Sequence, residues 1–384
     1  MSNNRFLLKT LATVRKHAHG QRLILFLSIL SGIFAGLAAL AIKNLVFFTK
    51  DTLAHLSSGP YQHYLLPVLP AIGILATILF SHGLLKKNVG HGIPMALYAI
   101  SKNKGKIQPH NMFSSIITST LTVGFGGSAG LEGPSVVTGA AWGSNIGRLF
   151  GVSHKKMILL IACSSAGAMA AIFKAPVAGI VFVLEVLMLE LTMASIIPLL
   201  LAALSGALVA FLLTGMDVVI PVDIQRGFLV NEVPFFILFG VLAGFLSAYF
   251  TKIFKSTEHI FDRIKSRYSR WFIGSMCLAV ILFFFPSIYG EGFEAIHSAL
   301  RGSVDFVFDG NMFNSQNDHS MMMAFFLLIM ILFLKIVATS VTFGSGGVGG
   351  IFAPSLFMGA LLGLLFVLAL RYFGIYDLPV DHFV

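Results

Sequence analysis

The sequence predicts an all-α membrane protein that crosses the bilayer many times, and its composition, hydropathy and interruptions all predict this. Apolar residues make up 57% of the 384 residues and charged residues only 11%, whereas soluble domains carry about a quarter charged residues. Apolar runs follow one another along the chain, and many are short or broken by glycine or proline. Irregular backbone at membrane depth is tolerated only where protein covers it or it lines a water-filled cavity. The composition therefore argues against a soluble enzyme, and the interruptions favour a transport pathway over a bundle of anchors.

The N-terminal segment 1–22 is basic and precedes the first apolar run. It contains no acidic residue, and its basic residues are Arg5, Lys9, Arg15, Lys16 and Arg22. Basic flanks tend to stay in the cytoplasm, so this segment predicts a cytoplasmic N-terminus. The run that follows, 23–48, is longer than the ~7–15 apolar residues of a cleaved signal peptide, which predicts a retained spanning helix. The net charge of +10 indicates basic cytoplasmic loops and no nucleic-acid partner.

The remaining apolar segments predict the other helices of a single membrane domain, 23–384. Several are shorter than the ~20 residues that a perpendicular span needs, which indicates tilted or broken helices. Basic clusters, such as Lys86 with Lys87 and those in 252–270, fit cytoplasmic loops. In chain order the segments are 64–84, 111–123, 134–150, 157–173, 175–191, 194–214, 233–251, 271–289, 321–343 and 351–372.

Two glycine-rich segments, 120–140 and 340–360, are related by an internal repeat. At a fixed offset of 220 they share Thr122/Thr342, Gly124/Gly344, Gly126/Gly346, Gly127/Gly347, Gly130/Gly350, Pro134/Pro354, Ser135/Ser355, Gly139/Gly359 and Ala140/Ala360. A weaker echo pairs 90–97 with 290–297. These matches predict two structural repeats, the first over about 23–214 and the second over about 232–384. Such repeats are typical of transporters whose sites form at the repeat interface.

Both segments have the same design, in which glycines lead into a proline at the start of an apolar helix. Glycine lets the backbone turn and approach a ligand closely, and proline is well tolerated in the first turn of a helix. The N–H groups and the positive dipole end there can bind an anion without a fixed positive charge. The alternative is that the glycines serve only close helix packing. The repetition of the design favours an anion site.

Three motifs resemble those of the CLC family of chloride channels and chloride/proton antiporters. They are GHGIP (90–94), GLEGP (130–134) and GGIFAP (349–354), and KAPVAGIVFVLE (174–185) is similar to the family's next helix. The resemblance implies an inverted-repeat bundle in the cell (inner) membrane that transports chloride or a similar anion. It further implies a homodimer with one pathway in each subunit and an interface formed by 175–191 and 194–214. Neither a cofactor nor a metal is implied.

By the same resemblance, Glu132 is the gating glutamate, whose carboxylate occupies an anion site and swings away to open the path. A carboxylate at a helix N-terminus imitates the permeant anion, although an ordinary helix cap has the same residue. His91 stands where the family usually has an anion-contacting serine, and imidazole can donate an N–H to an anion. The backbone amides of the other motif residues are expected to contact the anion; they belong to Gly92, Ile93, Leu131, Gly133, Ile351 and Phe352.

The family's antiporters carry an inner glutamate for protons, and Val186 occupies that position. Its neighbour Glu185 is acidic, but adjacent residues point about 100° apart on a helix. Valine there favours a passive or weakly coupled channel, with chloride/proton antiport as the alternative. An intramembrane enzyme using Glu132 and His91 is disfavoured, because the sequence has neither an HExxH metal spacing nor a nucleophile–base pair.

Two further expectations concern lysines in apolar surroundings and the length of the second repeat. We expect Lys174 and Lys335 to pair with helix-end carbonyls or to snorkel. About 80 residues lie between Pro134 and Thr214, but only 30 follow Pro354. By comparison with the first repeat, the second is therefore expected to be incomplete by about 50 residues, and a non-conducting truncated product is a further alternative.

Overall fold

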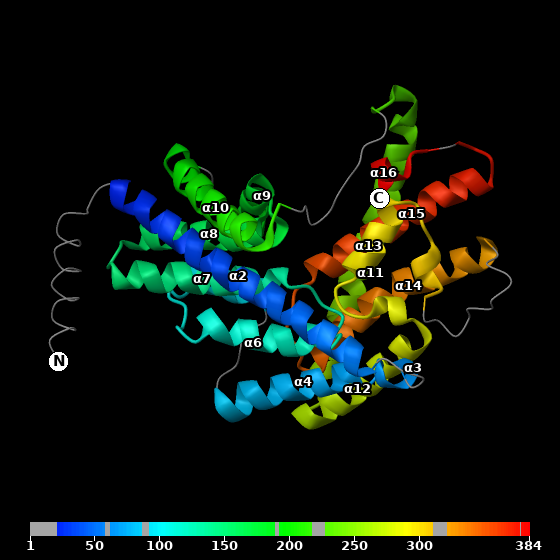
Figure 1. Cartoon of the computed structure of the whole chain (residues 1–384), viewed down its shortest axis with the longest axis horizontal. Helices are drawn as coiled ribbons and strands as arrows, with labels where there is room; N and C mark the ends of the chain where they lie inside the picture. The colour runs from blue at the N-terminus through cyan, green and yellow to red at the C-terminus, as the bar shows by residue number, and fades with distance from the viewer. Residues whose placement is uncertain are drawn as a thin grey trace. The chain divides into compact units, whose positions relative to one another are not determined.

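A computed structural model describes residues 21–57, 62–86, 92–188, 192–216, 227–309, 321–376 and 378–384. Helices make up most of these residues, and within these ranges seven helices are long and apolar enough to cross a membrane: α2, α8, α10, α11, α12, α14 and α15. In chain order the helices are α2 (Gln21–Ser57), α3 (Gln62–Leu65), α4 (Leu69–Leu79), α5 (Ile93–Ser101), α6 (Asn111–Gly124), α7 (Glu132–Leu149), α8 (His154–Phe173), α9 (Pro176–Leu187), α10 (Met193–Thr214), α11 (Val233–Asp262), α12 (Arg267–Phe284), α13 (Phe293–Leu300), α14 (Met321–Gly344), α15 (Phe352–Tyr372) and α16 (Val380–Phe383) (Figure 1).

The predicted all-α class is confirmed, and most apolar segments coincide with a helix within a few residues. The segment 271–289 is an exception, because α12 ends at Phe284 and Pro286 follows in a short 3₁₀ turn. Proline disfavours helical geometry in the residue before it, which explains the early end. The segment 64–84 is divided among α3, α4 and a π-helical turn over Phe80–Leu84. The short helices α5, α13 and α16 were not predicted.

The described chain forms two compact units, and two of the divisions between them fall within α2 and α6. The first unit comprises Met1–Leu45, Lys87–Ile117 and Glu132–Val219; the second comprises Val46–Lys86, Thr118–Leu131 and Ile220–Val384. The first unit contains α5, α7, α8, α9 and α10 with the starts of α2 and α6. The second contains α3, α4 and α11 to α16, with the ends of α2 and α6.

Small residues let the helices of the first unit approach one another closely. Gly32 of α2, Gly167 of α8 and Gly206 of α10 meet, and a Cβ on Gly167 would lie 2.8 Å from the Cα of Gly32. On α7, a Cβ on Gly139 would lie 2.7 Å from the carbonyl oxygen of Ser164 in α8. Glycine at such contacts is typical of helix packing in membranes.

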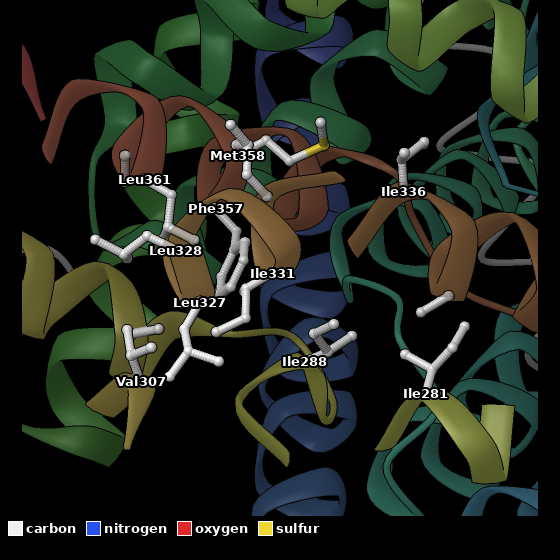
Figure 2. Close-up of a cluster of buried hydrophobic side chains, with 14 of the residues drawn as sticks. Ile281, Ile288, Val307, Leu327, Leu328, Ile331, Ile336, Phe357, Met358 and Leu361 are labelled. Carbon is white, nitrogen blue, oxygen red and sulfur yellow. The ribbon is translucent and has the colours of Figure 1, made fainter. Parts of the chain in front are cut away.

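Large apolar side chains fill the core of the second unit. Phe357 of α15 is fully buried and lies among Leu327, Leu328 and Ile331 of α14 (Figure 2). Ile288, from the turn after α12, belongs to the same cluster. This packing fixes α14 and α15 together with the turn that precedes α13.

Candidate functional site

The second unit contains the two glycine-rich loops, and the two loops turn in the same way. Gly126 has φ 90° and Gly346 has φ 101°, which are values that residues with a side chain rarely adopt. One residue later, Gly127 N donates to Thr122 O at 2.8 Å, and Gly347 N donates to the carbonyl oxygen of Thr342 at 2.9 Å. Each loop therefore reverses the chain directly after its helix.

The loops are also joined to each other by reciprocal hydrogen bonds. Gly130 N donates to Gly350 O at 2.8 Å, and Gly350 N donates to Gly130 O at 2.7 Å. These residues are equivalent in the sequence repeat, so their reciprocal pairing has local twofold symmetry. The predicted repeat is confirmed at these loops, where the equivalent segments run antiparallel.

The second loop leads into α15. Ile351 is the N-cap residue of α15 and is 42% exposed, and Phe352, the first helical residue, is half-buried. The first N–H groups of any α-helix have no acceptor within the helix, and the dipole makes this end positive. Since the loop is held by its neighbour, the start of α15 has a fixed position in this unit.

Glu132 begins α7, directly after Leu131 at the end of the first loop. Its side chain is 1% exposed, and Gly133 beside it is buried. The hydroxyl of Ser165 in α8 donates to Val136 O in the first turns of α7 at 3.2 Å. A carboxylate at this position is stabilised by the helix dipole. The first unit thus holds Glu132 at a buried helix start.

The GHGIP motif leads into α5 in the first unit. His91 lies outside the described residues. Gly92 precedes α5 with φ 57° and ψ −140°, and Ile93 is the first helical residue. This φ favours glycine, which explains the second glycine of the motif. Leu131, Ile351 and Phe352 belong to the second unit; the first unit contains the remaining described site residues, which are Gly92, Ile93, Glu132, Gly133, Glu185 and Val186.

Glu185 and Val186 lie near the end of α9 and occupy different environments. Glu185 is exposed, whereas Val186 is half-buried and packs against the apolar core of the first unit. This difference agrees with the expected angle between adjacent residues on a helix. The position that the family resemblance assigns to a proton-carrying side chain is therefore apolar and partly covered.

Both lysines bind carbonyl oxygens. Lys174 Nζ donates to Thr214 O at 3.1 Å and to Gly215 O at 2.8 Å, at the end of α10, so the expected pairing with a helix end is confirmed. Lys335 Nζ donates to Ile288 O at 2.9 Å and Gly290 O at 2.8 Å. Ile288 ends the short 3₁₀ turn after α12, and Gly290 lies between that turn and α13.

Two buried carboxylates, Glu232 and Glu291, were not expected from the sequence. Glu291 is 4% exposed, and its Oε2 lies 4.0 Å from Lys50 Nζ. Its only signal in the sequence is an acidic residue between two glycines in the segment that echoes GHGIPMAL. Nearby, the Tyr289 ring covers Gly126, and burial raises the pKa of this phenol. Within the described ranges no group of three or more His, Cys, Asp or Glu could hold a metal ion.

Comparison with known proteins identifies relatives over most of the chain. A family model described as "Voltage gated chloride channel" matches residues 72–384. The H(+)/Cl(-) exchange transporter ClcA of Vibrio vulnificus is 28% identical over 375 residues, which cover 93% of this chain and 75% of the relative.

Two solved structures have the same fold. A slow cyanobacterial Cl-/H+ antiporter superposes with a TM-score of 0.75 at 22% identity, over 93% of this chain and 80% of that one. A CLC-type fluoride/proton antiporter superposes with a TM-score of 0.71 at 23% identity, over 93% of this chain and 83% of that one.

Proposed function

Because the chain belongs to the voltage-gated chloride channel family, we propose that it carries chloride or a similar anion across a membrane in exchange for protons. The protein is a multi-pass integral membrane protein with seven candidate spans among its described residues. The observation that carries the proposal is the pair of reciprocally bonded loops, Gly130 to Gly350, which fixes the start of α15. No chemical transformation of the anion is involved.

The anion binds where partial charges replace a full charge. Backbone amides at Ile351 and Phe352, with the dipole of the 21-residue helix α15, attract an anion and still release it. A lysine or arginine in direct contact would hold the anion more tightly. The amides of Gly92, Ile93, Leu131 and Gly133 and the imidazole of His91 complete the pathway in this proposal.

Glu132 is the gate of the proposed pathway. Its buried carboxylate carries the same charge as the anion and sits at a helix start, the kind of position that anions prefer. While it remains there it competes with the permeant anion. Protonation or movement of the side chain opens the path, and protonation also gives Glu132 a role in carrying the proton.

Exchange is proposed in preference to passive conduction because a relative is named as an exchanger. Val186 remains the observation that favours a passive channel, since valine cannot carry a proton. Under exchange, Glu185 is the acidic residue nearest to that position in the chain, and its exposed side chain can take up a proton. We assign it the inner proton step.

The proposed assembly is a homodimer in the cell (inner) membrane, with the N-terminus in the cytoplasm. Residues 1–22 form the cytoplasmic segment and 23–384 the membrane domain. The helices assigned to the dimer interface expose apolar side chains. On α10 these recur every three or four residues and share one face; they are Ile197, Leu200, Leu204, Leu208 and Leu212.

Radiotracer flux into proteoliposomes tests this function. The full chain should accumulate ³⁶Cl⁻, and an imposed chloride gradient should drive protons uphill. Glu132→Gln should retain chloride flux and lose the proton movement, because a neutral amide neither competes with the anion nor carries a proton. Glu294→Gln is the matched control, since Glu294 also lies in the first turn of a helix but is exposed.

Each outcome of this experiment is informative. Chloride flux without proton movement in the unmodified protein would replace exchange by passive conduction. Loss of all chloride flux in a folded and inserted Glu132→Gln protein would contradict the gate. Absence of chloride flux in the unmodified protein would contradict the proposed function.

A further inference from the structure

Three charged side chains of the second unit meet at Gly290. Lys335, in the middle of α14, has no exposed surface, and its ammonium donates to the carbonyl oxygens of Ile288 and Gly290. Lys50 and the buried Glu291 form an ion pair at 4.0 Å. A Cβ on Gly290 would lie 2.9 Å from Lys50 Nζ, so both ammonium groups approach the same residue. We call Lys50, Glu291 and Lys335 the charge cluster.

Gly290, the residue at which the charge cluster meets, is bonded to the first glycine-rich loop. Gly290 N donates to Gly126 O at 3.1 Å, and the ring of Tyr289 lies against Gly126. Gly290 therefore has two partners. Its carbonyl oxygen accepts from Lys335, and its N–H donates to the loop. Through the Gly130–Gly350 bridge, this loop is joined to the residues that precede α15.

The charge cluster also lies beside α15 itself. Lys335 Nζ is 4.7 Å from the centre of the Phe357 ring. Phe357 follows Phe352 by five residues, which corresponds to about 7.5 Å along the helix axis. The ammonium is thus close enough to influence an anion at the start of α15.

With both lysines protonated, the charge cluster has a net charge of +1. Two carbonyl oxygens and an aromatic face surround Lys335 and favour the charged ammonium over the neutral amine, whereas its burial and the nearby ammonium of Lys50 oppose the charge. In an interior of low dielectric constant, such a charge acts over a longer range than it does in water. Its sign attracts anions.

We propose that the charge cluster sets the anion affinity of the α15 site from a distance, with Lys335 and Lys50 raising the affinity and Glu291 lowering it. The inference rests on the proposed function and assigns its affinity control to residues that do not touch the anion. Lys335 is a positioning residue in this sense. A charge that does not touch the anion strengthens its binding without the slow release that direct contact would cause.

Chloride titration calorimetry on the purified full chain tests the proposal without requiring flux. Lys335→Met should weaken chloride binding about 15-fold, as removal of a unit charge some 10 Å away at an effective dielectric constant of about 20 predicts. Lys335→Arg should bind within about twofold of the unmodified protein, because it keeps the charge. Glu291→Gln should bind chloride more tightly, by about threefold, because it removes the opposing charge.

The sign of the Glu291 effect separates this proposal from a purely structural role, since damage to the packing would weaken binding in every variant. Lys174→Met is the matched control, because Lys174 also binds two carbonyl oxygens, but these lie at the end of α10 and not in the turn that is bonded to the first glycine-rich loop. Its chloride affinity should not change. If Lys335→Met cannot be purified in a folded state, the chloride affinity of Glu291→Gln alone decides whether the proposal holds.

Unchanged affinity in folded Glu291→Gln, or weaker binding by it, overturns the proposal. If the unmodified protein binds no chloride, the proposed function fails and this inference fails with it. If the unmodified protein binds chloride and the variants bind it with the same affinity, only the inference is overturned.

Discussion

Thr122 and Thr342 each accept a hydrogen bond from the loop that follows the other threonine. Val348 N donates to Thr122 Oγ1 at 3.0 Å, and Ser128 N donates to Thr342 Oγ1 at 3.2 Å. Both threonines are fully buried. The hydroxyl of Thr342 donates in turn to Ala338 O at 2.8 Å. Each helix of the repeat thus positions the loop of its counterpart, so the two loops depend on each other for their conformation.

Replacing either threonine by valine should destabilise the protein. Thr122→Val leaves the N–H of Val348 without its hydroxyl acceptor, and Thr342→Val does the same to Ser128. A buried donor left without a partner costs about 1–3 kcal/mol of unfolding free energy. Thermal unfolding of the detergent-purified protein would measure the loss as a lower melting temperature.

Thr120→Val is the matched control for this prediction. Thr120 lies in the same helix, and its buried hydroxyl has no hydrogen-bond partner among the described residues, so its removal should cost little. Equal destabilisation by Thr120→Val and Thr122→Val would show that the hydrogen bonds from the loops to Thr122 and Thr342 contribute nothing specific to stability.

Alanine at the two equivalent turn glycines should have unequal effects. Both Gly126 and Gly346 have strongly positive φ, so alanine costs about 1–3 kcal/mol in backbone strain at each. A Cβ on Gly126 would overlap the Tyr289 ring, whereas a Cβ on Gly346 would lie 3.1 Å from the end of the Ile78 side chain. Gly126→Ala should therefore fail to fold, whereas Gly346→Ala should fold but have a lower melting temperature.

Size-exclusion chromatography of the two alanine variants gives the measurement. Gly126→Ala/Tyr289→Ala should recover part of the monodisperse peak, because it removes the obstructing ring. Equal yields of the two single variants would contradict the role assigned to Tyr289.

The sequence predicted the loops and their helices better than it predicted their contacts. The apolar run that begins at Phe352 and the repeat offset of 220 were visible as patterns along the chain. The hydrogen bond from Ser128 to Thr342 was not, because it joins residues 214 positions apart and depends on antiparallel pairing of the loops. The position of Glu132 at the start of α7 was expected from the proline that follows it.

Short helices and buried charges were the features that the sequence could not reveal. Helix α13 has 8 residues and α5 has 9, too few to produce a spanning apolar run. Glu291 is neutralised by Lys50 of α2, which lies 241 positions away in the chain. No local pattern in the sequence indicates that two residues so far apart form a pair.

Substitution of His91 should alter anion affinity if its imidazole lines the pathway. His91→Ala removes the N–H donor, so the apparent chloride affinity measured by flux should fall about tenfold, in line with about 1.5 kcal/mol for one hydrogen bond. The chloride affinity of His91→Ser should fall less, because the serine hydroxyl still provides a hydrogen-bond donor at this position. His154→Ala, at an exposed helix start, should leave the affinity unchanged. The imidazole would be assigned a place outside the pathway if the two His91 variants matched this control.

Proton exchange requires a titratable group at each end of the proton path, and Glu132 supplies only one. The family position for the other is Val186, which packs against the first unit's core. Glu185 is therefore the residue on which proposed exchange depends. Glu185→Gln should abolish uphill proton movement under an imposed chloride gradient and leave ³⁶Cl⁻ flux within about twofold, because the amide cannot carry a proton.

An external pH electrode and tracer flux on the same proteoliposomes would measure the two quantities together. Glu258→Gln, an exposed carboxylate of α11, is the control and should pump normally. Val186→Glu combined with Glu185→Gln should restore pumping, since it places a carboxyl group at the family position, at some cost in stability for burying a polar group against an apolar core. Persistent pumping by Glu185→Gln would mean that the proton enters by another residue. If the unmodified protein pumped no protons but the Val186→Glu single variant did, the valine would be what makes this chain a passive conductor.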